Sequence, residues 1–231
     1  MARLPDGGPV YAETDLTHVI AEPYNALSAL LFVGMVVWWY QRIGARRKEY
    51  PFLFWSLPIL LIGGIGGTVY HAFRAHPVWL FMDFMPILIL CLAASIYFWR
   101  YALPNRKALY AVVAGVVLFT GLSRVLMFGL SVPQRWMINL GYVQLALFIV
   151  IPVIWVLARS RWMNARWVAF SLGSFVLAVT FRSVDRMELL PMGTHFLWHV
   201  FGALSGHFLM EYIYQFRAVK GGVAMESAVA R

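Results

Sequence analysis

Charged residues and cysteine are both scarce in this sequence. Only 13% of its 231 residues are charged and 61% are hydrophobic, which excludes an ordinary soluble domain and a disordered chain. The single cysteine, Cys91, excludes an internal disulfide framework. The sequence also lacks internal repeats, low-complexity segments and, within its polar first 22 residues, the apolar core of a cleavable signal peptide.

Long apolar runs make up most of the chain. Each has about 20 residues, the length that spans a bilayer as a helix. We therefore predict an all-α integral membrane protein, a bundle of seven transmembrane helices. It forms one domain over residues 1–220, followed by a disordered tail at 221–231. The predicted spans are 24–43, 51–73, 78–98, 108–130, 137–158, 167–184 and 195–215.

The basic residues lie mainly in alternate loops between these spans. Of the 19 Lys and Arg residues, 13 fall on the side of the C-terminus and six on the side of the N-terminus. Positively charged loops stay in the cytoplasm, so the N-terminus is predicted outside and the C-terminus inside. This pattern is typical of a bacterial inner-membrane protein. Topology accounts for the net charge of +9, and no nucleic-acid partner is expected.

Four ionisable residues lie within or at the edge of the apolar spans: His71, Asp83, His195 and His199. Such residues are costly in hydrocarbon and persist there mainly as ligands, proton relays or paired charges. On the predicted topology, each lies within roughly 10–15 Å of the outer (periplasmic) boundary. His195 and His199 are four residues apart and share one helical face. Three histidines and a carboxylate at one depth favour a zinc site.

Each of these residues also has a structural alternative. His71 suits the membrane interface, and the other two histidines suit hydrogen bonds between helices. Asp83 is a candidate ion-pair partner for Arg124 or Arg182, which also lie in outer membrane halves. His207 lies about 80° around the helix from His199, so it is interpreted as a packing residue.

Three sequence blocks carry a family resemblance. Residues 21–28 read AEPYNALS, a Glu-x-x-Asn-x-x-Ser pattern at the start of the first span. Residues 63–71 read GGIGGTVYH and are followed by DFMP at 83–86. Residues 193–199 read GTHFLWH. In this order, over nearly the whole chain, the blocks resemble bacterial members of the alkaline ceramidase family, in the CREST superfamily of seven-helix membrane hydrolases.

The resemblance implies zinc-dependent hydrolysis of a lipid amide. It assigns the zinc to His71, His195 and His199. Asp83 becomes the general base that takes a proton from the attacking water. Zinc lowers the pKa of a bound water and polarises the acyl carbonyl. The expected substrate is a ceramide or a related N-acyl lipid that enters from the membrane.

One position departs from the family pattern. The family has a serine four residues before the first histidine, where this chain has Gly67. Thr68 is adjacent but about 100° around the helix. Tyr142 and Tyr70 are the alternative candidates for a donor to the oxyanion, with Tyr142 as the second catalytic residue.

The resemblance also suggests a calcium site near the N-terminus. Its candidate ligands are Glu13, Asp15 and Glu22, because calcium prefers oxygen ligands. The tryptophan–cysteine pair of the family motif is replaced here by Tyr11-Ala12.

Three functions remain open at this point. The first is a ceramidase-like lipid amidase. The second keeps the fold and metal but acts as a lipid acyl-ester hydrolase or a lipid-binding, receptor-like protein. The third is a transporter or channel, which favours broken helices near the midplane and repeat symmetry. The oligomeric state is left open, since glycine-rich faces pack helices within a bundle as well as between bundles.

Overall fold

The computed structural model describes residues 4–187 and 189–229. It does not describe the side chains of residues 134, 135, 138, 139, 142 and 218–229. Within the described residues, the chain is all helical, with seven long helices and no strand. These are α1 (Pro23–Ile43), α2 (Pro51–Phe73), α3 (Pro77–Ala102), α4 (Arg106–Gly129), α5 (Gln134–Arg159), α6 (Ala165–Ser183) and α7 (His195–Val229). Two short 3₁₀ turns, η1 (Gly44–Arg46) and η2 (Asp185–Met187), follow α1 and α6.

The helix starts follow from local sequence. Proline occupies the first position of α1, α2 and α3, where its fixed φ and missing N–H cost nothing. Asn105 caps α4, and its side chain accepts a hydrogen bond from the Ala108 N–H at 2.9 Å. The seven predicted helices are therefore confirmed as helices, with ends that differ by only a few residues except at the end of α7.

Four of the described helices are long and apolar enough to cross a membrane: α1 with η1, α2, α3 and α4. Their outward surface is apolar too, which suits contact with lipid chains rather than water. On α1 and α2, the large exposed apolar side chains include Leu27, Leu30, Leu31, Val37, Trp38, Trp55, Ile62, Ile65 and Phe73. The chain is thus a helical protein of membrane type.

The helices pack into two compact units, and the single domain over residues 1–220 stays a prediction. Unit 1 is Met1–Ile87 with Asn164–Arg231, and unit 2 is Leu88–Met163. The division falls inside α3, directly after Pro86 and Ile87. Continuous hydropathy does not reveal such a division, because both units present the same apolar composition to a sequence pattern.

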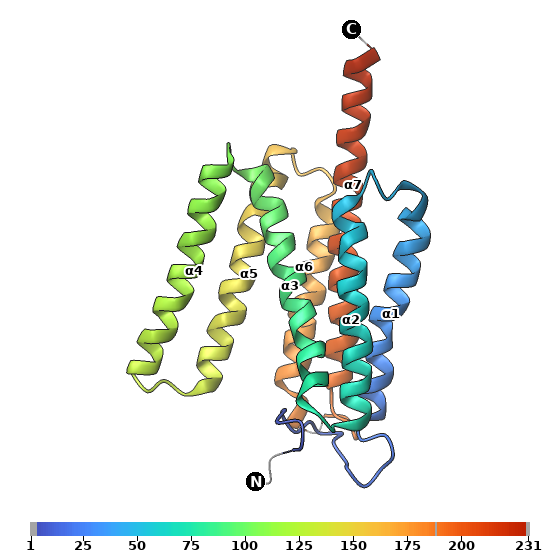
Figure 1. Ribbon diagram of the computed structural model, residues 1–231, viewed down its shortest axis with the longest axis vertical. Coiled ribbons are helices and arrows are strands. Elements are labelled where there is room, and N and C mark those ends of the chain that lie inside the picture. The colour runs from blue at the N-terminus through green and yellow to red at the C-terminus, as the bar shows by residue number, and fades with distance from the viewer. Residues whose placement is uncertain (1–3, 188, 230–231) are drawn as a thin grey trace. The chain divides into compact units, whose positions relative to one another are not determined.

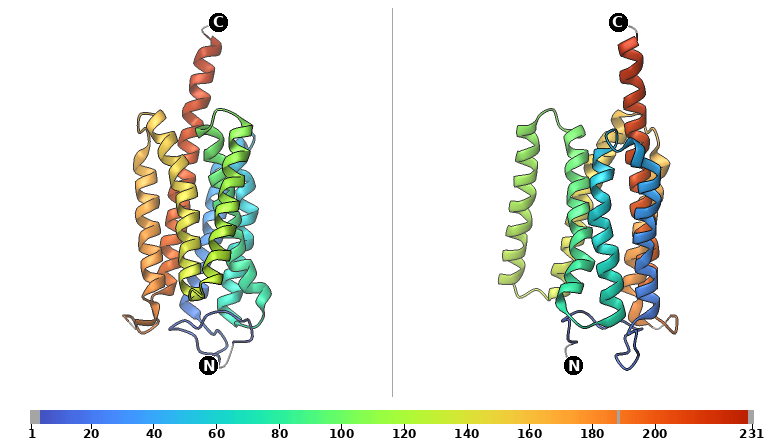
Figure 2. Two further views of the ribbon diagram at one scale, coloured as in Figure 1. Left: turned by 90° about the vertical axis from the view of Figure 1, so that its left-hand side faces the viewer. Right: turned by 45° about the vertical axis from the view of Figure 1, so that its right-hand side comes forward.

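Unit 1 contains α1, α2, α6, α7 and the first part of α3. In Figures 1 and 2, α1 lies beside α2, and α6 lies beside α7. Ser171 of α6 donates to the carbonyl oxygen of Ser205 of α7 at 2.9 Å. Arg42 of α1 forms a two-point ion pair with Glu211 of α7, with N–O distances of 2.6 and 2.9 Å. The largest side chains buried between these helices include Trp39, Ile43, Leu53, Tyr70, Tyr212 and Ile213.

The helix α7 extends well beyond the ends of α1 and α2 (Figure 1). Its backbone is helical to Val229, beyond the predicted span end near residue 215, and the disorder of residues 221–231 stays a prediction.

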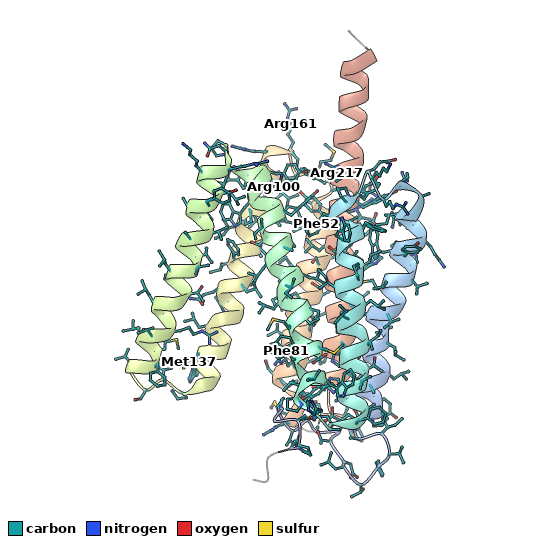
Figure 3. All side chains as sticks on the ribbon, in the orientation of Figure 1. Phe52, Phe81, Arg100, Met137, Arg161 and Arg217 are labelled. Carbon is teal, nitrogen blue, oxygen red and sulfur yellow. The ribbon has the colours of Figure 1, made fainter. Side chains whose placement is uncertain are left out.

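Basic side chains mark one end of each unit. Arg217 of unit 1 lies at the end away from the N-terminal residues, where it donates to the Glu49 carbonyl oxygen (Figure 3). Within unit 2, Arg100 and Arg161 lie at one end and Met137 at the other (Figure 3). The orientation of the chain in the membrane stays a prediction from the sequence.

Candidate metal centre

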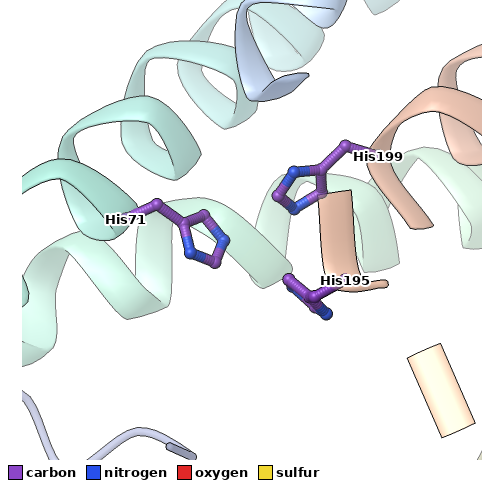
Figure 4. Close-up of side chains that lie close together, drawn as sticks. All are labelled: His71, His195 and His199. Carbon is purple, nitrogen blue, oxygen red and sulfur yellow. The ribbon is translucent and has the colours of Figure 1, made fainter. Parts of the chain in front are cut away.

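Three buried histidines of unit 1 point toward one another (Figure 4). His71 comes from the last turns of α2, and His195 and His199 from the first turns of α7. One nitrogen from each ring lies within 4.8 Å of the others. Zinc–nitrogen bonds of ~2.0–2.1 Å place such atoms roughly 3.4 Å apart, so small ring rotations close the set around one ion.

The ring nitrogens that face this point have no protein partner. His71 Nε2, His195 Nδ1 and His199 Nε2 are all buried without a hydrogen bond. Unpaired nitrogens are costly in an apolar interior. The donor set therefore fits a divalent metal such as zinc, which accepts neutral imidazole nitrogen and removes three unsatisfied atoms at once.

The opposite nitrogens of two rings are held from α1 and the residue that precedes it. His71 Nδ1 donates to Glu22 Oε2 at 2.5 Å, and both side chains are completely buried. His199 Nδ1 lies 3.1 Å from the Asn25 carbonyl oxygen and 2.8 Å from Ser28 Oγ. A carboxylate and a carbonyl only accept hydrogen bonds, so each Nδ1 carries the proton. Both Nε2 atoms are then free to bind a metal.

Glu22 is paired at both carboxylate oxygens. Burial alone raises the pKa of a carboxyl group, but here the hydrogen bond from His71 and the charge of Arg74 act against burial. Together they hold the pKa of Glu22 below its ordinary value. Glu22, Asn25 and Ser28, the polar residues of the first sequence block, thus contact the histidines at the Nδ1 atoms of His71 and His199.

Asp83 lies on the second turn of α3, against α2. A Cβ built on Gly67 would lie 2.5 Å from Asp83 Oδ1, so only glycine fits there without displacing the carboxylate. Gly67 is one helical turn before His71 on the same face. The absence of a side chain at residue 67 therefore lets the Asp83 carboxylate approach α2 near the histidine cluster.

Thr68 and Tyr70, two of the residues predicted as oxyanion donors, have hydroxyl groups in different environments. Thr68 Oγ1 donates to the Gly64 carbonyl oxygen of its own helix at 2.8 Å, so it is engaged away from the site. The Tyr70 hydroxyl is buried without a partner, and its ring meets His71 edge-on at 4.7 Å. The side chain of Tyr142 lies outside the described residues. His207 contacts the rings of Trp38 and Trp39, as expected for a packing residue.

The proposed calcium ligands do not converge. Among the described residues, the three histidines are the one group of His, Cys, Asp and Glu that is close enough to hold a metal. Glu13 accepts from the N–H groups of Tyr24 and Asn25 and so caps α1. Asp15 is bound to Thr17 in the exposed loop, and Glu22 faces His71. Each carboxylate has a separate structural partner, and the calcium site stays a prediction.

Sequence patterns missed the N-terminal segment, residues 4–22, as part of the site. The Tyr11 ring stacks on the His195 ring with 3.8 Å between centroids. Asp185 Oδ1 accepts from the N–H groups of Thr194 and His195, each at 2.8 Å, and so caps α7. Its Oδ2 accepts from the Ala12 N–H at 2.9 Å. No single-sequence signal pairs residues 173 positions apart, although Asp185 stands just before the histidine block.

The fold and the cluster define a helical protein of membrane type with a buried three-histidine site. A scan against models of known protein families gives no match for this chain, and a search of curated proteins gives none either. Function is therefore inferred from the site itself.

Proposed function

We propose that this protein is a zinc-dependent membrane hydrolase of lipid amides, similar to alkaline ceramidases. The observation that supports this most is the set of three buried, partnerless imidazole nitrogens inside an apolar helical bundle. The Asp83 carboxylate lies against Gly67, one turn before His71. All seven helices cross the membrane in this proposal. The N-terminus and the histidines lie on the periplasmic side of a bacterial inner membrane, since basic residues cluster at the other end.

His71, His195 and His199 would hold the zinc, which supplies a Lewis acid and lowers the pKa of water. Asp83 would take the proton of the attacking water, because its carboxylate lies against Gly67, which is one helical turn before His71 on the same face. Glu22 and Ser28 keep the His71 and His199 rings in the protonation state that leaves Nε2 unprotonated. Exposed apolar side chains on the helices suit a long-chain substrate such as a ceramide or another N-acyl lipid.

A lipid-ester hydrolase or a lipid-binding, receptor-like protein is the second candidate. One observation favours it: no hydroxyl group stands at residue 67, and the neighbouring Thr68 hydroxyl is engaged by its own helix. Loss of an oxyanion donor slows acyl transfer by about 10²–10³-fold.

The test combines metal analysis with lipid hydrolysis on purified protein. We expect one zinc per chain in the wild type, loss of zinc in His199→Ala, and retained zinc without turnover of an N-acyl sphingosine in Asp83→Asn. His207→Ala is the matched control, because His207 is on α7 but outside the cluster. Wild-type zinc content in His199→Ala would reject the site. Zinc binding without turnover of amide or ester lipids would favour the receptor-like alternative.

A further inference from the structure

Arg74 is a buried arginine just outside the three-histidine cluster. It follows the last residue of α2 and has a left-handed backbone, with a φ of 50°. This conformation is uncommon for a residue with a Cβ, so favourable contacts of the side chain must offset its cost.

The guanidinium group of Arg74 binds the N-terminal segment at several points. Its Nε donates to Asp6 Oδ2 at 2.6 Å, and its Nη2 donates to the Pro9 carbonyl oxygen at 2.8 Å. Its Nη1 donates to Glu22 Oε1 and, at 3.4 Å, to Thr14 Oγ1. One cation therefore gathers oxygen acceptors from the whole length of the segment.

The same segment covers the histidines. Tyr11, between Pro9 and Thr14, stacks on His195 and lies 5.4 Å from the His71 ring. Figures 1 and 2 show the segment at the end of unit 1 where α2 ends and α7 begins. The residues bound by Arg74 thus flank the residue that lies directly over the cluster.

The N-terminal segment, residues 4–22, therefore forms a lid over the three histidines. Glu22 connects this lid to the cluster. Its Oε2 accepts from His71, while its Oε1 accepts from Arg74 and, at 2.5 Å, from Thr14. A carboxylate held at both oxygens has one orientation, so Arg74 also fixes the His71 ring. Without the guanidinium, Asp6 and Glu22 would be two buried carboxylates with no cation between them, which is strongly unfavourable.

We propose that Arg74 is a built-in cation that clamps the N-terminal segment over the histidine cluster and orients His71 through Glu22. The fixed guanidinium group binds several oxygen atoms of the segment, which is what a bound calcium ion does in calcium sites. Arg74 is a positioning residue. Its effect on zinc affinity rests on the proposed function, whereas its effect on the lid does not.

The experiment measures hydrogen exchange of residues 4–22 in the full-length protein in detergent. Arg74→Ala should raise exchange about 10-fold or more, because several charged hydrogen bonds are lost. Zinc affinity, measured by chelator competition, should fall about 10–100-fold as His71 loses its support. Arg74→Lys should be intermediate, since an ammonium group lacks the planar fork. Arg186→Ala is the matched control: Arg186 also donates to the segment, at the Val10 carbonyl oxygen, but is exposed.

Chemical rescue of Arg74→Ala by free guanidinium distinguishes loss of the cation from a general loss of structure. Millimolar guanidinium added to Arg74→Ala should restore most of the protection, and the calcium chelator EGTA should leave the wild type unchanged. Native protection in Arg74→Ala, or equal exposure in Arg186→Ala, would overturn the clamp. Loosening of the wild-type segment by EGTA would show that an external cation holds it instead.

If Arg74→Ala does not fold, Asp6→Asn, which weakens one acceptor pair, should give a smaller rise in exchange. An unchanged rate in that variant would also overturn the clamp. If the wild type binds no zinc, the exchange measurements still test the lid.

Discussion

Replacing Gly67 with alanine should separate the proposed zinc site from Asp83, the proposed catalytic base. The added Cβ would lie 2.5 Å from Asp83 Oδ1, whereas ordinary contacts begin at 3.4 Å. The carboxylate must therefore retreat by about 0.9 Å. A misplacement of about 1 Å in a catalytic group costs on the order of 10²-fold in rate. Overpacking of this kind also destabilises by about 1–3 kcal/mol.

We expect Gly67→Ala to keep its zinc and to lose about 10²-fold in turnover of an N-acyl sphingosine. Gly67→Ser adds the same Cβ and a hydroxyl that donates to the displaced carboxylate. A hydrogen bond to a charged group is worth about 1.5–3 kcal/mol, so the serine variant should melt at a higher temperature than the alanine variant. Its turnover should also be higher.

Gly64→Ala is the matched control for crowding. A Cβ there would meet Val33 Cγ2 at 2.9 Å on α1, away from Asp83. This variant should lose stability to a similar extent and keep its turnover. Native turnover in Gly67→Ala would refute the placement of Asp83 as the base. Equal loss of turnover in Gly64→Ala would show that crowding of α2, rather than movement of Asp83, is responsible.

Three further predictions follow from other contacts. Glu22→Gln should weaken zinc binding about 10–100-fold in chelator competition, because an amide is a weaker acceptor for His71; native affinity would contradict this. Arg42→Met should lower the free energy of unfolding by about 3 kcal/mol and leave zinc content unchanged, because it strands Glu211 at the far end of unit 1. The double variant Arg42→Met with Glu211→Met should recover much of that loss. Equal stability of the single variant Arg42→Met and the double variant would argue against a stabilising Arg42–Glu211 ion pair. In a cysteine-free background, an impermeant thiol reagent outside intact cells should label Met192→Cys and not Lys107→Cys; the opposite pattern would reverse the orientation.

The helices and the histidine cluster were predictable from the sequence alone. Apolar runs of about 20 residues leave little choice of secondary structure, because every backbone polar group in lipid must be bonded within its own helix. Proline and asparagine then set the starts of α1 to α4. The spacing of His195 and His199 gives one helical face, and equal depth brings His71 to it.

Only the tertiary structure decided how that cluster is supported. Arg74 and Asp6 are 68 positions apart, and Asp185 and Ala12 are 173 apart; local periodicity carries no information on such pairs. The same structure pairs Glu13 with the Asn25 N–H of α1 and Glu22 with His71, and sequence spacing indicates neither partner. Residue type determines which groups must be paired in an apolar interior, but the packing of the helices and the path of the N-terminal segment determine which partner each group receives.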